Sequence, residues 1–225
     1  MTDKLLGGII VGQPTDLVER QRAGKGLTSV PSGPARGLAL RSLVVSSGWD
    51  RMWNLLGGGQ SIYFLSIAFD LSNHKPVVLP PKEVPEGAVF RVKHGEKITF
   101  SLGDGAPLFP ARVINGGLVI YITICTANHG MQHVGKVMAE VHEQLAKDDS
   151  LTKSIVGFVA NPAQSVVEKV LGAATAALQP IATILKSNED DYEALFTGIY
   201  PAKGPWTNRL TATQHGATIE LVELH

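Results

Sequence analysis

The fold is decided by the stretch Ile62-Tyr63-Phe64-Leu65-Ser66-Ile67-Ala68-Phe69-Asp70-Leu71. It is rich in aromatic and β-branched residues, which favour strands, and its alternating positions are apolar on both faces. A strand with two apolar faces is stable only when both are buried, so we predict that this stretch lies in the middle of the body. Residues 118–125 have the same character after a Gly116-Gly117 turn, and they predict a second central strand.

Strand signals of a weaker kind surround these two segments. Residues 38–45 predict a further strand. Residues 89–93 and 97–102 alternate polar with apolar side chains around the turn 94–96, and this pattern predicts a half-exposed hairpin. The segment 76–85 carries several prolines, which cannot donate to a sheet ladder. It is therefore predicted to be an edge strand or a polyproline II segment.

The period of the apolar residues then changes from strand-like to helix-like. Residues 131–145 place apolar side chains three or four positions apart, with polar ones opposite, and they predict an amphipathic helix. Asp148-Asp149-Ser150 predicts the cap of a second helix. A third helix is predicted from 163 to 186, with a kink at Pro180 because proline removes a backbone hydrogen bond.

Strand signals return at the carboxyl end, where residues 209–214 and 217–224 predict a hairpin. The predicted fold is therefore mainly β with an α insertion (α+β). It is an antiparallel β-sandwich with a helical block between the central strands and the C-terminal hairpin. Residues 1–36 are predicted to form an N-terminal arm, because glycine and proline interrupt them. Residues 37–225 are predicted to form the sandwich domain, with the helical insertion at about 129–195.

The charge balance excludes one large class of partner. The 225 residues include 20 Lys and Arg against 20 Asp and Glu, so the formal net charge is zero. No global field then draws the protein to nucleic acid or to an acidic membrane, and no nucleic-acid partner is expected. A neutral surface also gives little protection against self-association, so a homo-oligomer is one expectation.

Cysteine content and hydropathy bear on the compartment. The single cysteine, Cys125, cannot form an intramolecular disulfide, and its apolar surroundings favour a buried thiol over a nucleophile. Residues 1–11 are too weakly apolar for a secretory signal, and no apolar window reaches the length of a transmembrane helix. A cytoplasmic protein is the default expectation. Export by a route that uses no signal peptide is the alternative.

Two histidines form the first candidate metal site. His129 and His133 lie four positions apart at the start of the predicted helix, which places both imidazoles on one face, as transition-metal ligation requires. In the zinc protease motif a glutamate follows the first histidine, whereas here the residue is Gly130. His142 falls on the opposite side of the helix. The alternative interpretation is a pair of solvent-exposed helix histidines.

Three aspartates form the second candidate metal site. Asp50, Asp70 and Asp104 lie near strand ends or in glycine-flanked turns. Strand ends that meet at one rim of a sandwich can gather carboxylates around a hard cation, so calcium is the cofactor this pattern predicts. The alternative is ordinary turn chemistry, since aspartate favours such positions in any protein.

Two further sequence features bear on function. No Gly-x-Ser-x-Gly elbow is present to support a serine nucleophile. Residues 170–185 carry no charge. They predict either a helix buried against the sandwich or in an oligomer interface, or a segment that inserts into a membrane.

These patterns favour a non-enzymatic binding or assembly module, since no constellation of catalytic residues accompanies the architecture. Its partner is a protein, a lipid surface or another copy of the chain. The first alternative is a metal-dependent hydrolase that uses His129 and His133 or the rim aspartates. The second alternative is a membrane-active effector that uses the helical insert.

Overall fold

Strand β3 (Gln60–Asp70) lies in the middle of a sheet, as its two apolar faces predict. In this computed structural model the sheet runs in the order β1-β9-β8-β3-β4, and β5 also pairs with β3. Its pairs are antiparallel except for β1 with β9, which is parallel. We call it the central sheet. Its other strands are β1 (Ile10–Val11), β4 (Asn73–Leu79), β5 (Val89–Val92), β8 (Leu118–Thr126) and β9 (Tyr192–Tyr200).

A second sheet, which we call the outer sheet, is antiparallel throughout. It runs in the order β10-β11-β2-β6, and β7 also pairs with β2. Its strands are β2 (Arg36–Val45), β6 (Lys97–Thr99), β7 (Ala106–Arg112), β10 (Arg209–Ala212) and β11 (Ala217–Leu224). The β10–β11 pair confirms the predicted C-terminal hairpin.

The structure describes the residues of these strands and of the helices, with gaps between them. The described residues are 10–11, 34–45, 59–70, 73–93, 95–100, 105–114, 118–147, 179–188, 192–200, 205–206, 209–212 and 217–225. Most of the predicted arm of 1–36 and the second predicted helix therefore lie outside them. So does the third predicted helix before 179. Pro180 is described, as the second residue of the helical segment 179–187, but the preceding residues that a kink would involve are not.

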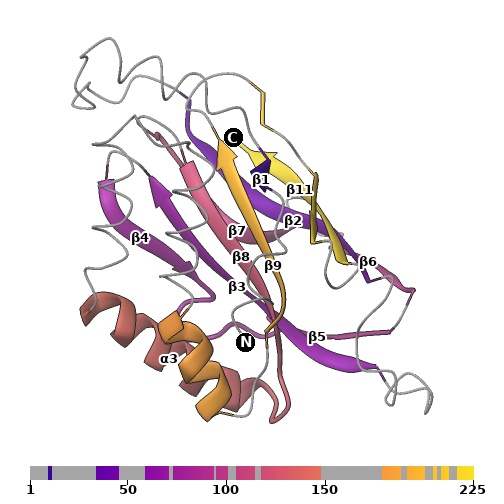
Figure 1. Ribbon diagram of the computed structural model, residues 1–225. Coiled ribbons are helices and arrows are strands. Elements are labelled where there is room, and N and C mark those ends of the chain that lie inside the picture. The colour runs from indigo at the N-terminus through magenta and orange to yellow at the C-terminus, as the bar shows by residue number, and fades with distance from the viewer. Residues whose placement is uncertain are drawn as a thin grey trace.

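Helix α3 (Met131–Lys147) confirms the amphipathic pattern, since Val134, Val137, Met138 and Val141 are its buried residues. A second helical segment, 179–187, is the described part of the third predicted helix. The two helices lie beside one another against the central sheet (Figure 1). The molecule is thus built in three layers: helices, central sheet and outer sheet.

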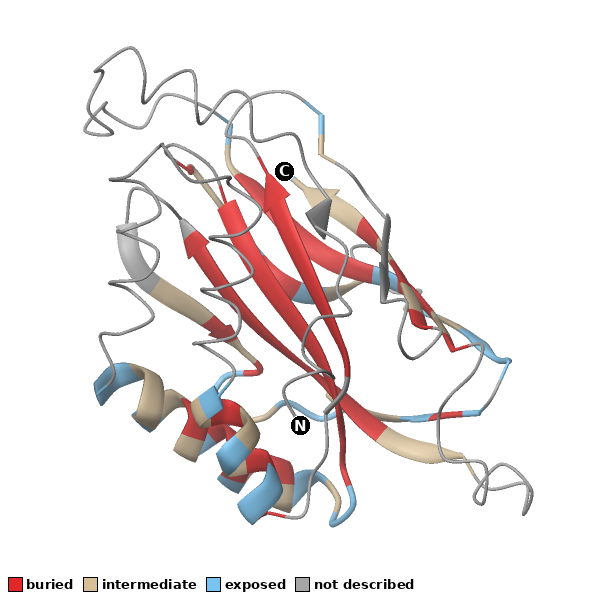
Figure 2. Ribbon diagram, in the orientation of Figure 1, coloured by how far each residue is buried: buried red, intermediate tan, exposed pale blue. Residues whose placement is uncertain are grey.

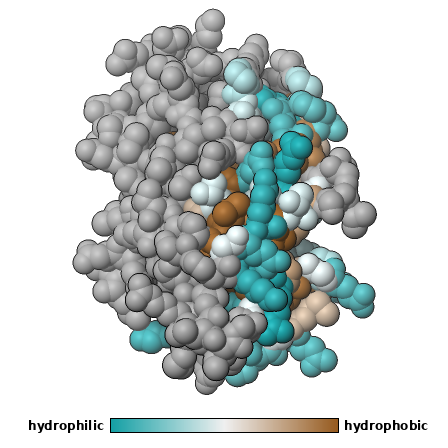
Figure 3. All heavy atoms as spheres, turned by 90° about the vertical axis from the view of Figure 1, so that its right-hand side faces the viewer, coloured by the Kyte–Doolittle hydropathy of each residue, from teal (hydrophilic) through white to brown (hydrophobic). Residues whose placement is uncertain are grey.

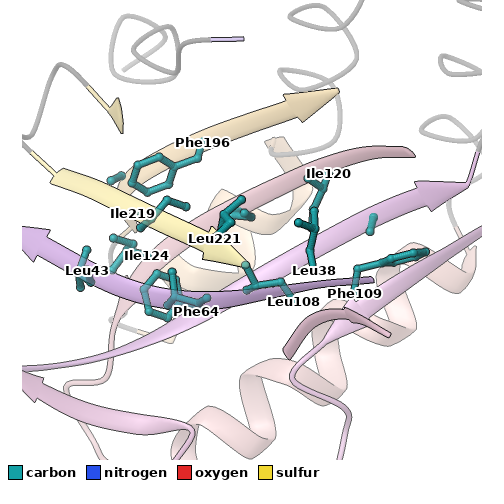
Figure 4. Close-up of a cluster of buried hydrophobic side chains, with 14 of the residues drawn as sticks. Leu38, Leu43, Phe64, Leu108, Phe109, Ile120, Ile124, Phe196, Ile219 and Leu221 are labelled. Atoms are coloured by element: carbon teal, nitrogen blue, oxygen red, sulfur yellow. The ribbon is translucent and has the colours of Figure 1, made fainter. Parts of the chain in front are cut away.

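This layering explains why β3 and β8 are apolar at nearly every position. Alternate side chains of a strand point to opposite faces. On β3, Leu65 and Ile67 pack with the helices, whereas Ile62 and Phe64 pack against the outer sheet. Both strands are almost entirely buried (Figure 2). The opposed side chains of the two sheets, among them Phe64, Ile120 and Leu221, meet in the space between them (Figure 4).

The outer sheet turns its other face away from the core. Viewed from that side, the described residues are largely hydrophilic (Figure 3). Lys97 and Glu220 illustrate this face, where their charged groups lie 3.9 Å apart. Strand β11 alternates buried with half-buried positions, as a strand with one buried face does, whereas β2 is buried at nearly every position.

The predicted hairpin of 89–93 and 97–102 is wrong in its pairing. The turn itself forms, since Glu96 N donates to Lys93 O at 3.1 Å. However, β5 pairs with β3 in the central sheet, whereas β6 pairs with β2 in the outer sheet. The chain therefore passes from one sheet to the other at this turn, which is a corner of the sandwich rather than a hairpin.

Two long strands were not among the sequence predictions. Strand β7 lies in the outer sheet, and β9 is a neighbour of β8 in the central sheet. The described helices therefore lie between two strands that are paired with each other. The predicted edge strand is confirmed in part, because β4 forms the end of the central sheet and contains Pro76.

Two tyrosine hydroxyls are buried in these layers. Tyr121 lies on the helix side of the central sheet with 1% of its surface exposed, and Tyr200 lies between the sheets with none. Burial raises the pKa of both hydroxyls well above the ordinary value of 10.0, because the phenolate would lose its hydration. Both groups therefore stay neutral in the folded protein at pH values where the unfolded chain ionises.

Alkaline pH is consequently expected to destabilise the fold. Above pH 10.0 the unfolded chain loses protons that the folded chain keeps, so the free energy of unfolding falls as the pH rises. Each tyrosine contributes about 1.4 kcal/mol per pH unit, which gives a loss of about 3 kcal/mol by about pH 11. Urea unfolding at a series of pH values measures this loss. The Tyr121→Phe and Tyr200→Phe variants should each lose about half as much, and an unchanged slope in the double variant would contradict the assignment.

Candidate functional site

The two candidate histidines lie close together, although only His133 is on α3 and His129 lies in the turn before the helix. The ring centroids of His129 and His133 lie 4.9 Å apart with an angle of 67° between the planes. His133 Nε2 lies 2.7 Å from the backbone oxygen of Asn188. Because a carbonyl oxygen only accepts, Nε2 carries the proton and donates. In this arrangement that nitrogen connects α3 to the end of segment 179–187 and is not a metal ligand.

Asn188 extends this connection between the helices. Its Nδ2 donates to Glu140 Oε2 at 3.0 Å and to the Ile184 backbone oxygen at 2.9 Å. His142 Nε2 lies instead 3.1 Å from the Pro80 oxygen, which agrees with the predicted placement of His142 and His133 on opposite sides of α3. Among the described residues, no group of three or more His, Cys, Asp or Glu is placed to hold a metal ion.

The candidate calcium ligands are mostly outside the described residues. Asp50 and Asp104 both fall there. Asp70 is the last residue of β3, paired in register with Asn73 on one side and Leu118 on the other. The convergence of the three aspartates at one rim therefore stays a prediction.

A pocket between the two sheets, which the sequence did not suggest, is the stronger candidate. It has a volume of about 210 Å³ and lies between the β4–β5 side of the central sheet and strand β7 of the outer sheet. Its walls are mainly apolar, with phenylalanine, proline and leucine among the lining side chains. The lining residues are Phe64, Ser66, Leu79, Pro80, Pro81, Pro85, Glu86, Gly87, Ala88, Phe90, Phe100, Ala106, Pro107 and Leu108.

Three phenylalanine rings from different segments line this pocket. Phe64 and Phe90 are stacked with centroids 5.4 Å apart, and Phe100 meets Phe90 edge-on at 5.1 Å. Phe64 and Phe100 also meet edge-on, at 6.2 Å. Aromatic pairs prefer these offset and edge-to-face arrangements, so the rings hold one another in place. The pocket wall is therefore preorganised.

The polar groups of the pocket are few. Ser66 is buried, and its hydroxyl donates to the Leu108 backbone oxygen at 2.8 Å, so it is already satisfied. Glu86 is the ionisable lining residue and is exposed, as are Pro81 and Pro107. The pocket thus opens to the surface among prolines, and its interior favours a neutral, apolar guest over a charged one.

The sequence contains the residues of this pocket but not the signal that gathers them. A hairpin of 89–93 and 97–102 would have paired the segments of Phe90 and Phe100 within one sheet. The pocket forms where those segments, which belong to opposite sheets, bring Phe90 and Phe100 into contact with each other and with Phe64.

Comparisons with known proteins give no match from which a function could be inferred. No protein-family model matches the chain, and neither a curated protein nor a solved structure matches it. Of the helices that the structure describes, none is long and apolar enough to cross a membrane.

Proposed function

We propose that the protein is a non-enzymatic binding module whose inter-sheet pocket receives an apolar side chain of a partner protein. The observation that carries this proposal is the preorganised aromatic wall around Phe64, Phe90 and Phe100, beside which the buried Ser66 hydroxyl is already hydrogen-bonded. Such a wall offers apolar contact and ring stacking. Of the described lining residues, Glu86 is the ionisable one, and it is exposed at the opening rather than set against the aromatic wall.

The size and setting of the pocket favour a side chain over a larger free ligand. Sites for drug-sized molecules usually enclose about 300–1,000 Å³. The pocket of about 210 Å³ is smaller and opens among the exposed residues Pro81, Pro85 and Pro107. An aromatic or aliphatic anchor residue that enters from a partner surface fits this shape, and such anchors dominate the energetics of many protein interfaces.

Indole, the side-chain analogue of tryptophan, tests the pocket directly. Titrated into isotope-labelled protein, it is expected to shift the amide resonances of lining residues, with a dissociation constant in the millimolar range. Ala88→Phe fills the pocket and should weaken binding at least tenfold. Ala139→Phe, which adds the same ring at an exposed position of α3, should leave it unchanged. Equal binding by both variants, or shifts elsewhere in the molecule, would refute the proposal.

Three further measurements on the same two variants distinguish a partner protein from a lipid or a second copy of the chain. A short peptide with a central tryptophan should compete with indole, whereas its alanine counterpart should not. Phosphatidylcholine vesicles should retain no protein, and light scattering should give the same mass for both variants. Vesicle binding lost in Ala88→Phe would make the occupant a lipid, and a mass lowered in Ala88→Phe would make it a second copy. Either result overturns the assignment to a partner protein.

A further inference from the structure

Two arginines meet at one end of the outer sheet. Arg36 is the first residue of β2, and Arg112, the last residue of β7, is its partner in the strand register. Like charges directly opposite one another on paired strands repel. Such a pair is stable only where each charge has a partner, so the surroundings of each guanidinium decide what this end of the sheet binds.

Arg36 has its counterion within the chain. Its side chain is 7% exposed, and its Nε donates to Glu223 Oε1 on the neighbouring strand β11. The guanidinium also lies over the ring of Trp206, 4.1 Å from the centroid. Arg36 and Glu223 together are neutral, and neither leaves charge to balance a second arginine.

Arg112 is in a different position. Its Nε and Nη2 are buried, and neither has a hydrogen-bond partner in the part of the chain that the structure describes. It makes no ion pair with the residues that the structure describes, and its guanidinium lies over the ring of Phe109 at 4.8 Å. Buried polar groups in folded proteins are nearly always hydrogen-bonded, and a charged donor without a partner is the most costly exception.

The two unsatisfied nitrogens share one edge of the guanidinium. Nε and Nη2 point their N–H groups in the same direction, which forms the fork that binds two oxygens of a carboxylate or phosphate at once. Water can accept from both donors, but it leaves the charge unbalanced. An oxyanion satisfies both donors and the charge together.

We propose that the edge of Arg112 formed by Nε and Nη2 is a binding site for an oxyanion, a carboxylate or a phosphate group. The ring of Phe109 supports the guanidinium from one face, and the neutral pair of Arg36 and Glu223 leaves the positive charge of Arg112 to the ligand. This site uses residues other than those of the apolar pocket and does not depend on the function proposed for it.

Thermal unfolding in sodium phosphate, compared with sodium chloride of equal ionic strength, tests the site. At a phosphate concentration about ten times the dissociation constant, the midpoint is expected to rise by about 3–6 °C in the wild type. The rise should persist in Arg41→Met, which removes an exposed arginine from the same strand as Arg36, and should vanish in Arg112→Met. No rise in the wild type, or an equal rise in Arg112→Met, would overturn the proposal.

The Tm of the variants in chloride separates this role from a structural one. Because Arg112→Met removes an uncompensated buried charge, its Tm in chloride should equal or exceed that of the wild type. A clear loss of Tm there would make Arg112 a structural residue and overturn the proposal. Arg112→Lys keeps the charge but loses the fork, so its phosphate affinity by calorimetry should fall at least tenfold. Unchanged affinity would contradict the two-nitrogen geometry.

The same calorimetric titration identifies the source of the oxyanion. Inorganic phosphate and acetate are each titrated into the wild type and Arg112→Met. Tighter phosphate binding that depends on Arg112 assigns the site to a phosphorylated ligand, and tighter acetate binding assigns it to a carboxylate such as an acidic side chain. Binding of either ion that is the same in both proteins contradicts the site.

Discussion

Ile67→Ala and Ile122→Ala are each expected to lower the free energy of unfolding by about 2–5 kcal/mol, although the two side chains lie on opposite faces of the central sheet. Ile67 is 1% exposed and packs on the helix side, whereas Ile122 is fully buried between the sheets. Each truncation removes apolar contacts and leaves a cavity that close-packed neighbours fill only in part.

The comparison of the two variants is a test of the three-layer arrangement. In a sandwich of two sheets alone, one face of β3 would meet solvent, and Ile67→Ala would cost less than about 1 kcal/mol. Urea unfolding monitored by circular dichroism measures both losses. Val222→Ala on β11, where the side chain is half-buried, serves as the control and should change stability by less than about 1 kcal/mol. A large loss for Ile122→Ala with a small one for Ile67→Ala would show that the helices do not cover the sheet.

The central strands were predictable because burial on two faces is a local property. A strand covered on both sides needs apolar residues at nearly every position, and β3 and β8 have them. The amphipathic period of α3 is local in the same sense. The overall class, mainly β with a helical insertion and two antiparallel sheets, follows from these elements and is confirmed.

The missed strands depend on contacts that no local pattern records. Strand β7 contains Pro107 and Pro110, which argue against a strand, yet the structure accommodates them because β2 is its one partner among the described strands. Strand β9 contains Glu193 and Gly198, which weaken its strand pattern. It is held between β8 and β1, so its neighbours rather than its propensity fix it as a strand.

The candidate sites differ in the same way, in whether they depend on local spacing in the sequence or on which strands are neighbours. The sequence predicts that His129 and His133 lie close together, and they do, but helical spacing is not the cause, since α3 begins at Met131 and His129 lies in the turn before it. The pocket and the pairing of Arg36 with Arg112 follow from which strands are neighbours. Strand order depends on contacts between distant segments, and a single sequence does not contain it in readable form. These sites therefore became visible only with the topology.

Gly105, the residue before β7, shows how such a long-range contact constrains one position. Its φ is +76°, in the left-handed region that a Cβ disfavours by about 1–2 kcal/mol. A Cβ there would also press directly on the Leu40 carbonyl oxygen and lie 3.1 Å from its carbon. Leu40 pairs in register with both Ala106 and Leu221, so its carbonyl has no free direction in which to move.

Gly105→Ala is therefore expected to lower the free energy of unfolding by about 2–5 kcal/mol, the sum of backbone strain and overpacking. Gly95→Ala is the matched control, because Gly95 has the same φ of +76° and an added Cβ would meet nothing within 4 Å. Its loss should be about 1–2 kcal/mol, from backbone strain alone. Urea unfolding of both variants isolates the steric part as the difference between them.

Equal losses in the two variants would mean that Leu40 yields to the added methyl group, and that β2 and β7 are not held together as the register requires. A larger loss at Gly105 would establish that position 105 requires glycine because β2 approaches it so closely. That result would also change the interpretation of Gly103-Asp104-Gly105, which the sequence offers as part of a calcium site. At least one of its glycines serves the packing of the outer sheet, and the sequence pattern around Asp104 needs no bound cation to account for it.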